Sequence, residues 1–431
     1  MVHFNLNSFL RALSTMLDFV EMDLVGVTSN HGRRVAYIAA RLARQAGLPD
    51  AQVFDVVALS LLHDNGLSEE MLTMPASVAG DVKIRQAEKF VGHCEIGERN
   101  ATAFPFLTDV SGVIRHHHER HDGGGYFGLT GEEIPFLSRL VGMADSVDLM
   151  FAFGSPDPAN RDRILRHLAD ARGRQLCPRS CDLFFEIADK PAFWLDLQDG
   201  FIETALTEQT PDIWQDLPWD RVLDICRVFS RIVDCKSHFT ERHSSGLEEK
   251  AARMAAFYGF DAETATKLRI AASLHDVGKL AIPNAILDKP GPLTAAEFGR
   301  MQEHTYYTRR CLEQVRGFGD ITDWAANHHE RLTGVGYPLG LAADDLDAKA
   351  RLMACLDVYQ ALIEERPYRK ALSHRHAMDI LEAQARDGLL DAAIVADIDA
   401  AFAVPAADVG GDAGAIVRKR RSSGVTTGGP E

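Results

Sequence analysis

The sequence lacks a long apolar run, a surplus of positive charge and a dense set of cysteines. No stretch of 18 apolar residues occurs, which predicts no membrane-spanning helix. Asp18, Glu21 and Asp23 interrupt the apolar pattern of the N-terminus, which is typical of an amphipathic helix and not of a signal peptide. The formal net charge of −16 disfavours general nucleic-acid or membrane-surface binding. Seven cysteines without dense spacing suit reduced thiols, so we expect a cytoplasmic protein.

A series of alternating apolar and polar residues, the pattern of a half-buried strand, is also missing. Apolar residues instead recur at helical spacing, for example over Leu6–Met22 and its counterpart Leu217–Asp234. Two further apolar segments, Val53–Leu62 and Leu268–Leu274, each lead into a His-Asp pair. The sequence therefore predicts an all-α fold.

The chain does contain an internal sequence repeat. "HHHERHDGGGYFG" begins at His116, and "NHHERLTGVGYPLG" begins at Asn327. Matching blocks follow each other at an offset of 211 or 212 residues: His31 with His243, His63-Asp64 with His275-Asp276, His93 with His304, His118 with His329, and Asp145 with Asp357. This register predicts two tandem copies of one helical domain. We expect domains at 1–200 and 201–404, followed by a disordered tail at 405–431.

The repeated residues are nearly all histidines and aspartates, which are ligands for divalent metals such as Mn, Fe and Zn. Any single histidine is more often an ordinary core or surface residue, but the whole set recurs at matched spacing. In the second copy the candidate metal ligands are His243, His275, Asp276, His304, His328, His329 and Asp357. In the first copy they are His31, His63, Asp64, His93, His117, His118 and Asp145. Asp276 could bridge two ions, and such a pair can clamp the attacking and leaving oxygens of a phosphoryl displacement.

Cations follow these ligands in the second copy alone. Lys279 lies three residues after Asp276 and could contact a substrate phosphate, with a solvated surface lysine as the less favoured alternative. Arg366 and Arg369 could bind a phosphate bidentately, or could simply begin a charged helix. The first copy has Leu67 where the second has Lys279, and Gly154 where the second has Arg366.

These motifs resemble the HD superfamily of metal-dependent phosphohydrolases. Residues 230–390, with "HDVGKLAIPNAILDKPGPLT", "HHE", "GYPLGL" and "RPYRKA" in order, are similar to the HD-GYP family of bacterial cyclic dinucleotide phosphodiesterases. The resemblance implies an all-helical domain with two or three metal ions, Fe or Mn being favoured and Zn, Ni or Mg possible as alternatives. It implies that Asp276 and Lys279 are catalytic and that Lys279 and Arg366 bind the substrate phosphate, while Arg369 stays a substrate-binding candidate from the residues themselves. The implied substrate is cyclic di-GMP or cyclic GMP-AMP, opened to a linear dinucleotide.

The sequence also departs from the HD-GYP pattern. Leu332 and Thr333 replace the usual Trp and Asp, and Gln360 replaces an Asp that the first copy keeps as Asp148. The first copy resembles a divergent HD domain with a regulatory or dimerising role, and a homodimer or a signalling partner is expected. Three alternatives remain: another HD-type phosphohydrolase or nucleotidase, a di-iron oxygenase, and a signalling protein that binds a nucleotide without turnover.

Overall fold

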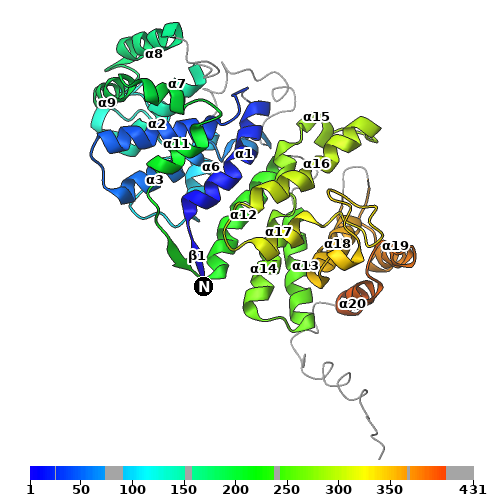
Figure 1. The fold of residues 1–431 in the computed structure, drawn as a ribbon. Coiled ribbons are helices and arrows are strands. Elements are labelled where there is room, and N and C mark those ends of the chain that lie inside the picture. The colour runs from blue at the N-terminus through cyan, green and yellow to red at the C-terminus, as the bar shows by residue number, and fades with distance from the viewer. Residues whose placement is uncertain (25, 73–90, 151–157, 237–242, 366–368, 404–431) are drawn as a thin grey trace, which may run out of the picture.

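The computed structural model describes residues 1–24, 26–72, 91–150, 158–236, 243–365 and 369–403, and these confirm the all-α fold (Figure 1). Helices before residue 210 are α1 (Leu6–Leu24), α2 (His31–Gln45), α3 (Asp50–Leu61), α4 (Leu67–Leu72), α6 (Gly92–Ala101), η2 (Gly131–Glu133), α7 (Phe136–Met150), α8 (Pro158–Ala171), α9 (Pro178–Ala188), α10 (Pro191–Asp196) and α11 (Ile202–Gln209). The later helices are α12 (Trp219–Lys236), α13 (His243–Tyr258), α14 (Ala262–Leu274), η3 (Val277–Ala281), α15 (Asn284–Leu287), α16 (Ala295–Leu312), α17 (Gly319–Ala326), η4 (Ala343–Asp345), α18 (Ala348–Ile363), α19 (His374–Arg386) and α20 (Ala392–Phe402). The predicted tail at 405–431 lies outside the described residues, as does Arg366.

Strand structure among the described residues is limited to one short ribbon. β1 (Val2–Phe4) pairs antiparallel with β2 (Gln215–Leu217), with Val2 opposite Leu217 and Phe4 opposite Gln215. Each strand directly precedes the first long helix of its copy, α1 or α12. The ribbon therefore joins equivalent points of the two copies.

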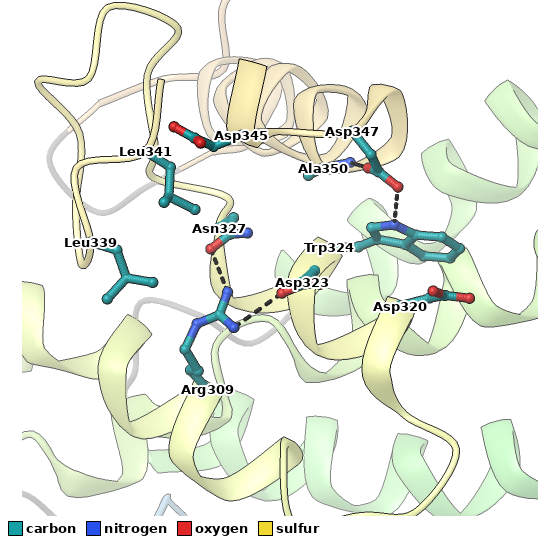
Figure 2. Close-up of a pocket in the computed structure, with 10 residues that line it drawn as sticks. All are labelled: Arg309, Asp320, Asp323, Trp324, Asn327, Leu339, Leu341, Asp345, Asp347 and Ala350. Carbon is teal, nitrogen blue, oxygen red and sulfur yellow. Dashed lines mark hydrogen bonds and ion pairs between the residues drawn. The ribbon is translucent and has the colours of Figure 1, made fainter. Parts of the chain in front are cut away.

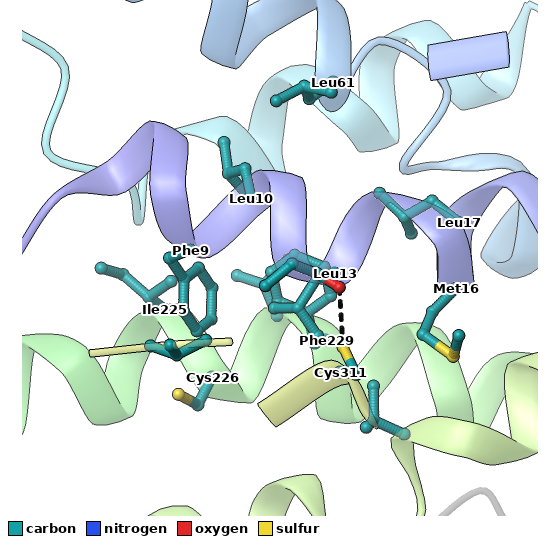
Figure 3. Packing of buried hydrophobic residues seen from close by; sticks show 14 of the residues in the cluster. Phe9, Leu10, Leu13, Met16, Leu17, Leu61, Ile225, Cys226, Phe229 and Cys311 are labelled. Carbon is teal, nitrogen blue, oxygen red and sulfur yellow. Dashed lines mark hydrogen bonds between the residues drawn. The ribbon is translucent and has the colours of Figure 1, made fainter. Parts of the chain in front are cut away.

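The helices α1 and α12 lie side by side between the two copies (Figure 1). Figure 3 shows the contact: Phe9 and Leu13 of α1 face Ile225 and Phe229 of α12. The rings of Phe9 and Phe229 meet edge to face with their centroids 5.6 Å apart. The α1 helix also packs on η3 and α16 of the second copy, while α12 packs on α4 of the first. Each copy therefore completes the core of the other, and the buried apolar residues form one continuous cluster.

The position of α11 bears on where the copies divide. This helix packs against α2 of the first copy, although it begins at Ile202, beyond the expected limit of 1–200. The division at residue 200 remains a prediction, and this packing favours a boundary between Gln209 and Gln215. None of the helices in the described part of the chain is long and apolar enough to cross a bilayer.

A glycine in each copy allows the segment after the His-Asp pair to approach the helix that carries the next histidine. A Cβ on Gly278 would lie 1.9 Å from the carbonyl oxygen of His304, and one on Gly66 would lie 2.3 Å from that of His93. Real Cβ atoms do not come so near a backbone oxygen, so the backbones must separate if either glycine gains a side chain. This contact sets the distance between Asp276 and His304.

We expect Gly278→Ala to lower the free energy of unfolding by about 1–3 kcal/mol, the usual cost of overpacking a core. The matched control is Gly299→Ala in α16, where a Cβ meets nothing within 4 Å. That change should instead raise stability by about 0.5–1 kcal/mol, because glycine is a poor residue inside a helix. Denaturant midpoints of the two variants check both signs, and equal midpoints would contradict the close contact.

Candidate metal centre

The structure brings together the seven histidines and aspartates predicted in the second copy. They come from the start of α13 (His243), the end of α14 (His275 and Asp276), α16 (His304), the segment after α17 (His328 and His329) and α18 (Asp357). Asp276 lies at the centre, with Oδ2 3.1 Å from His275 Nε2 and Oδ1 3.4 Å from His304 Nε2. Asp357 Oδ1 lies 3.2 Å from His243 Nε2. Two neighbouring donor groups result, His243-His275-Asp276 and His304-His328-His329, and each could hold a metal ion.

A hydrogen bond at Nδ1 fixes the ring orientation of three of these histidines. Nδ1 of His275 lies 2.7 Å from the carbonyl oxygen of Ala272, three residues earlier. His304 and His328 make the same contact with the third residue before them, also at 2.7 Å. An N–H at Nδ1 donates to the carbonyl, so the lone pair at Nε2 faces the cluster, which is the tautomer that a metal ligand requires.

Unpaired polar atoms in the interior indicate that the cluster suits a positive ion. His275 Nε2 and Asp276 Oδ1 are buried and have no hydrogen-bond partner, and in the first copy the same holds for His63 Nε2, His117 Nε2 and Asp64 Oδ1. A buried polar atom without a partner is costly. A divalent cation satisfies imidazole and carboxylate donors together, so the residues present fit a metal.

The protonation states of His304, His328 and Asp276 also suit metal binding. Burial lowers the pKa of His304 to about 4 and that of His328 to about 3, so both imidazoles are neutral at pH 7. Burial alone would raise the pKa of Asp276, but His275 and Lys279 hold it well below its usual range. The carboxylate therefore stays ionised.

Of the three predicted cations, only Lys279 is seen beside the cluster in the described part of the chain. Its Nζ lies 2.5 Å from Asp276 Oδ2, and its side chain keeps 22% of its surface exposed. The helix continues past Asp276 as a 3-10 turn, and the spacing of three residues still brings the ammonium group to the carboxylate. The guanidinium of Arg369 donates to the carbonyl oxygens of Ala361 and Leu362 at the end of α18, which gives it a structural role. A substrate contact by Arg369 remains a prediction, as does one by Arg366.

The glutamate of the repeated "HHE" organises the glycine-rich loop that follows it. Glu330 is buried and accepts hydrogen bonds from the backbone N–H groups of Leu339 and Leu341, at 2.7 and 2.9 Å. The loop folds back so that the ring of Tyr337 lies against His329, with centroids 4.8 Å apart. Glu119 makes the equivalent pair of bonds in the first copy. The motif therefore places an aromatic side chain over the last histidine of the cluster.

The first copy forms a similar cluster from its own predicted residues. His93 Nε2 and His117 Nε2 lie 3.4 and 3.6 Å from Asp64 Oδ1. Asp145 Oδ1 lies 3.4 Å from His31 Nε2 and 3.6 Å from His63 Nε2. The remaining predicted residue, His118, belongs to the donor group around His93 and His117.

Two carboxylates that sequence reasoning missed contact the first histidine of a set: Glu21 lies against His31 and Glu364 against His243. In the first copy Asp148 holds His31 Nδ1 at 2.6 Å, but the second copy has Gln360 at that position. Glu364, one helical turn later, takes over this role and lies 2.9 Å from His243 Nδ1. In the first copy the buried Glu21 also points at the cluster, with Oε2 3.6 Å from His31 Nε2. Its charge within the apolar pattern of the N-terminal helix was the only signal in the sequence.

A separate pocket of about 210 Å³ lies beside the glycine-rich loop (Figure 2). Leu339 and Leu341 line it together with Arg309, whose guanidinium already bonds to Asp323 and Asn327 at 3.0 and 2.8 Å. The other charged residues that line it are acidic: Asp320, Asp323, Asp345 and Asp347. A pocket with this charge disfavours an anionic ligand, so we do not assign the phosphodiester to it.

Comparison with known proteins agrees with this geometry. A 3'3'-cGAMP-specific phosphodiesterase of Vibrio cholerae is 29% identical over 382 residues, which cover 86% of this chain and 87% of the relative. A probable cyclic di-GMP phosphodiesterase of the same organism is 45% identical over 119 residues, 26% of this chain and 27% of that protein.

A crystal structure of a cyclic GMP-AMP-specific phosphodiesterase from V. cholerae has the same fold, with a TM-score of 0.66 and 24% identity. The match covers 94% of this chain and 99% of that one. The family model described as "HD domain" matches residues 16–168 and 227–394, one segment in each copy. The chain therefore belongs to the HD domain family.

Proposed function

We propose that the protein is a metal-dependent phosphodiesterase that opens a bacterial cyclic dinucleotide, and that the second copy carries the activity. The observation that supports this assignment most directly is the ammonium group of Lys279 beside Asp276. The first copy has the apolar Leu67 at that position. A phosphodiester is an anion, and a chain with net charge −16 must supply its cations locally.

The proposed ligands are the seven clustered residues of the second copy, with Asp276 between the two donor groups. A pair of divalent ions bound there would supply Lewis acidity to the phosphoryl oxygens and a nucleophile from water near neutral pH. Iron or manganese is our first expectation, because imidazole and carboxylate donors suit both. The number of ions and their identity are part of the proposal.

The side chains of the second copy have separate tasks in this proposal. Asp276 keeps its negative charge and stays in place through its contacts with His275 and Lys279. Lys279 is partly exposed, so its ammonium group can exchange this contact for a substrate phosphate oxygen. Tyr337 presents its ring next to His329, where a flat nucleobase could stack. These groups bind and orient the phosphodiester.

Two cyclic dinucleotides remain candidates, and the extent of the matches favours cyclic GMP-AMP. The relative named for 3'3'-cGAMP matches across both copies, whereas the one named for cyclic di-GMP matches about a quarter of the chain. We further propose that the protein acts in the cytoplasm, because all seven cysteines are free thiols, as expected in a reducing compartment.

The first test compares equivalent aspartates in the two copies. Asp276→Asn should reduce metal content and lower hydrolysis of 3'3'-cGAMP by more than about 100-fold, since even outer partners of metal ligands cost 10–100-fold. Asp64→Asn should leave the rate per folded molecule unchanged. Metal analysis and chromatography of the products measure both effects. Loss of turnover in Asp64→Asn alone would show that the first copy, and not the second, carries the activity.

A second test concerns the lysine. Lys279→Ala should keep the metal and lose about 1–3 kcal/mol in kcat/KM, the scale of a charge-assisted hydrogen bond. Lys267→Ala is the control, because Lys267 pairs with Glu263 on α14 and should not affect kinetics. Unchanged kinetics in Lys279→Ala would make this lysine an ordinary surface residue.

A third test addresses Glu364, which we regard as a positioning residue for His243. Glu364→Ala should weaken metal binding by about 10–100-fold, and Glu364→Gln, which keeps an acceptor, should fall between it and the wild type. The neighbouring exposed Glu365 supplies the control Glu365→Ala. The rate of metal release to a competing chelator ranks the metal affinity of the four proteins. Equal release from the wild type and all three variants would show that Glu364 does not position His243.

A further inference from the structure

We propose that Cys94 is a metal ligand in the first copy, where it joins three histidines in a closed site that favours zinc. The site consists of Cys94, His93, His117 and His118. It goes beyond the seven residues that the two copies share, and it does not depend on the activity proposed for the second copy.

The geometry of the four donors supports this assignment. Cys94 lies in α6, is fully buried, and has its Sγ 3.4 Å from His93 Nε2. One donor atom from each of the four residues lies within 4.8 Å of all the others. His117 supplies an independent indication of an ion. Its side chain is fully buried, Nδ1 is fixed 2.6 Å from the carbonyl oxygen of Ile114, and Nε2 faces inward without a hydrogen-bond partner.

The equivalent position in the second copy shows what is particular to the first. Thr305 stands there, and its hydroxyl donates to the carbonyl oxygen of Gln302 in its own helix at 3.0 Å. The matching donor group of the second copy contains only three histidines, His304, His328 and His329. The donor group of the second copy thus has one protein donor fewer, and Cys94 supplies that additional donor in the first.

The chemistry of the donor set determines both the metal and its role. Zinc prefers four ligands from thiolate sulfur and imidazole nitrogen, and four protein ligands are typical of structural sites. Catalytic sites keep a position open for water. A thiolate also favours zinc over manganese or magnesium. On binding, the thiol of Cys94 loses its proton to solvent and the Sγ–metal bond forms. The first copy then holds a metal firmly but cannot activate water at that ion.

The test uses the full-length protein reconstituted with cobalt(II), which reports a thiolate ligand through a sulfur-to-cobalt charge-transfer band in the near ultraviolet. Wild-type protein with cobalt bound in both copies should show the band. Cys94→Thr, which installs the residue of the second copy, should lose it and should release zinc to a chelator faster than wild type. Hydrolysis of 3'3'-cGAMP should remain at the wild-type rate.

The control for other thiols is the double variant Cys177→Ser/Cys181→Ser, which changes the two remaining cysteines of the first copy and should keep the band. Wild-type protein with full cobalt content and no charge-transfer band overturns the proposal without reference to any variant. Persistence of the band in folded Cys94→Thr overturns it as well. A failure of the proposed function would appear differently, as wild-type protein that has the cobalt band but does not cleave the dinucleotide.

Discussion

Both candidate centres depend on hydrogen bonds at Nδ1, which hold histidine rings with Nε2 facing the cluster. For five of the ten candidate histidines a backbone carbonyl three residues earlier fixes Nδ1, as Ala272 does for His275 and Ser60 does for His63. The carbonyls of Ala272 and Ser60 belong to the last turns of α14 and α3, where no later amide N–H of the helix is available to donate to them. The end of a helix thus supplies the acceptor, and the direction of Nε2 follows from the path of the helix. The two clusters remain similar because the helix ends are similar, even where the surrounding side chains have diverged.

The two copies share donors but differ in what surrounds them. Burial keeps His328 neutral in the second copy, with a pKa of about 3. For its counterpart His117 in the first copy, burial alone would lower the pKa, but Cys94 and Asp64 raise it to about 9. The first cluster also contains the thiol of Cys94 and the buried Glu21, whose pKa burial raises to about 8. The second has the ammonium group of Lys279 beside Asp276.

The sequence was sufficient to predict the helical fold and the clustering of the repeated histidines and aspartates, because a duplicated pattern makes each copy a reference for the other. It did not reveal residues that have no counterpart in the repeat. Glu364 replaces the missing Asp148 from a different turn of the helix, which an alignment by offset cannot show. Cys94 corresponds to a threonine, and the ligand role that we propose for it rests on its distance to three imidazoles. The sequence made Arg369 a candidate phosphate ligand, and in the structure its guanidinium donates to the end of α18. The direction of a side chain decides between these contacts, and the sequence pattern does not give that direction.

The crossed packing of α1 and α12 has a consequence for how such a protein can change over generations. The apolar face of each helix is covered partly by the other copy, so deletion of either half would expose residues such as Phe9 or Phe229 to water. A copy without chemistry of its own would therefore still be needed to keep the other copy soluble. Its cluster is free to acquire a different ligand or a different metal, provided that its helices still cover their neighbours.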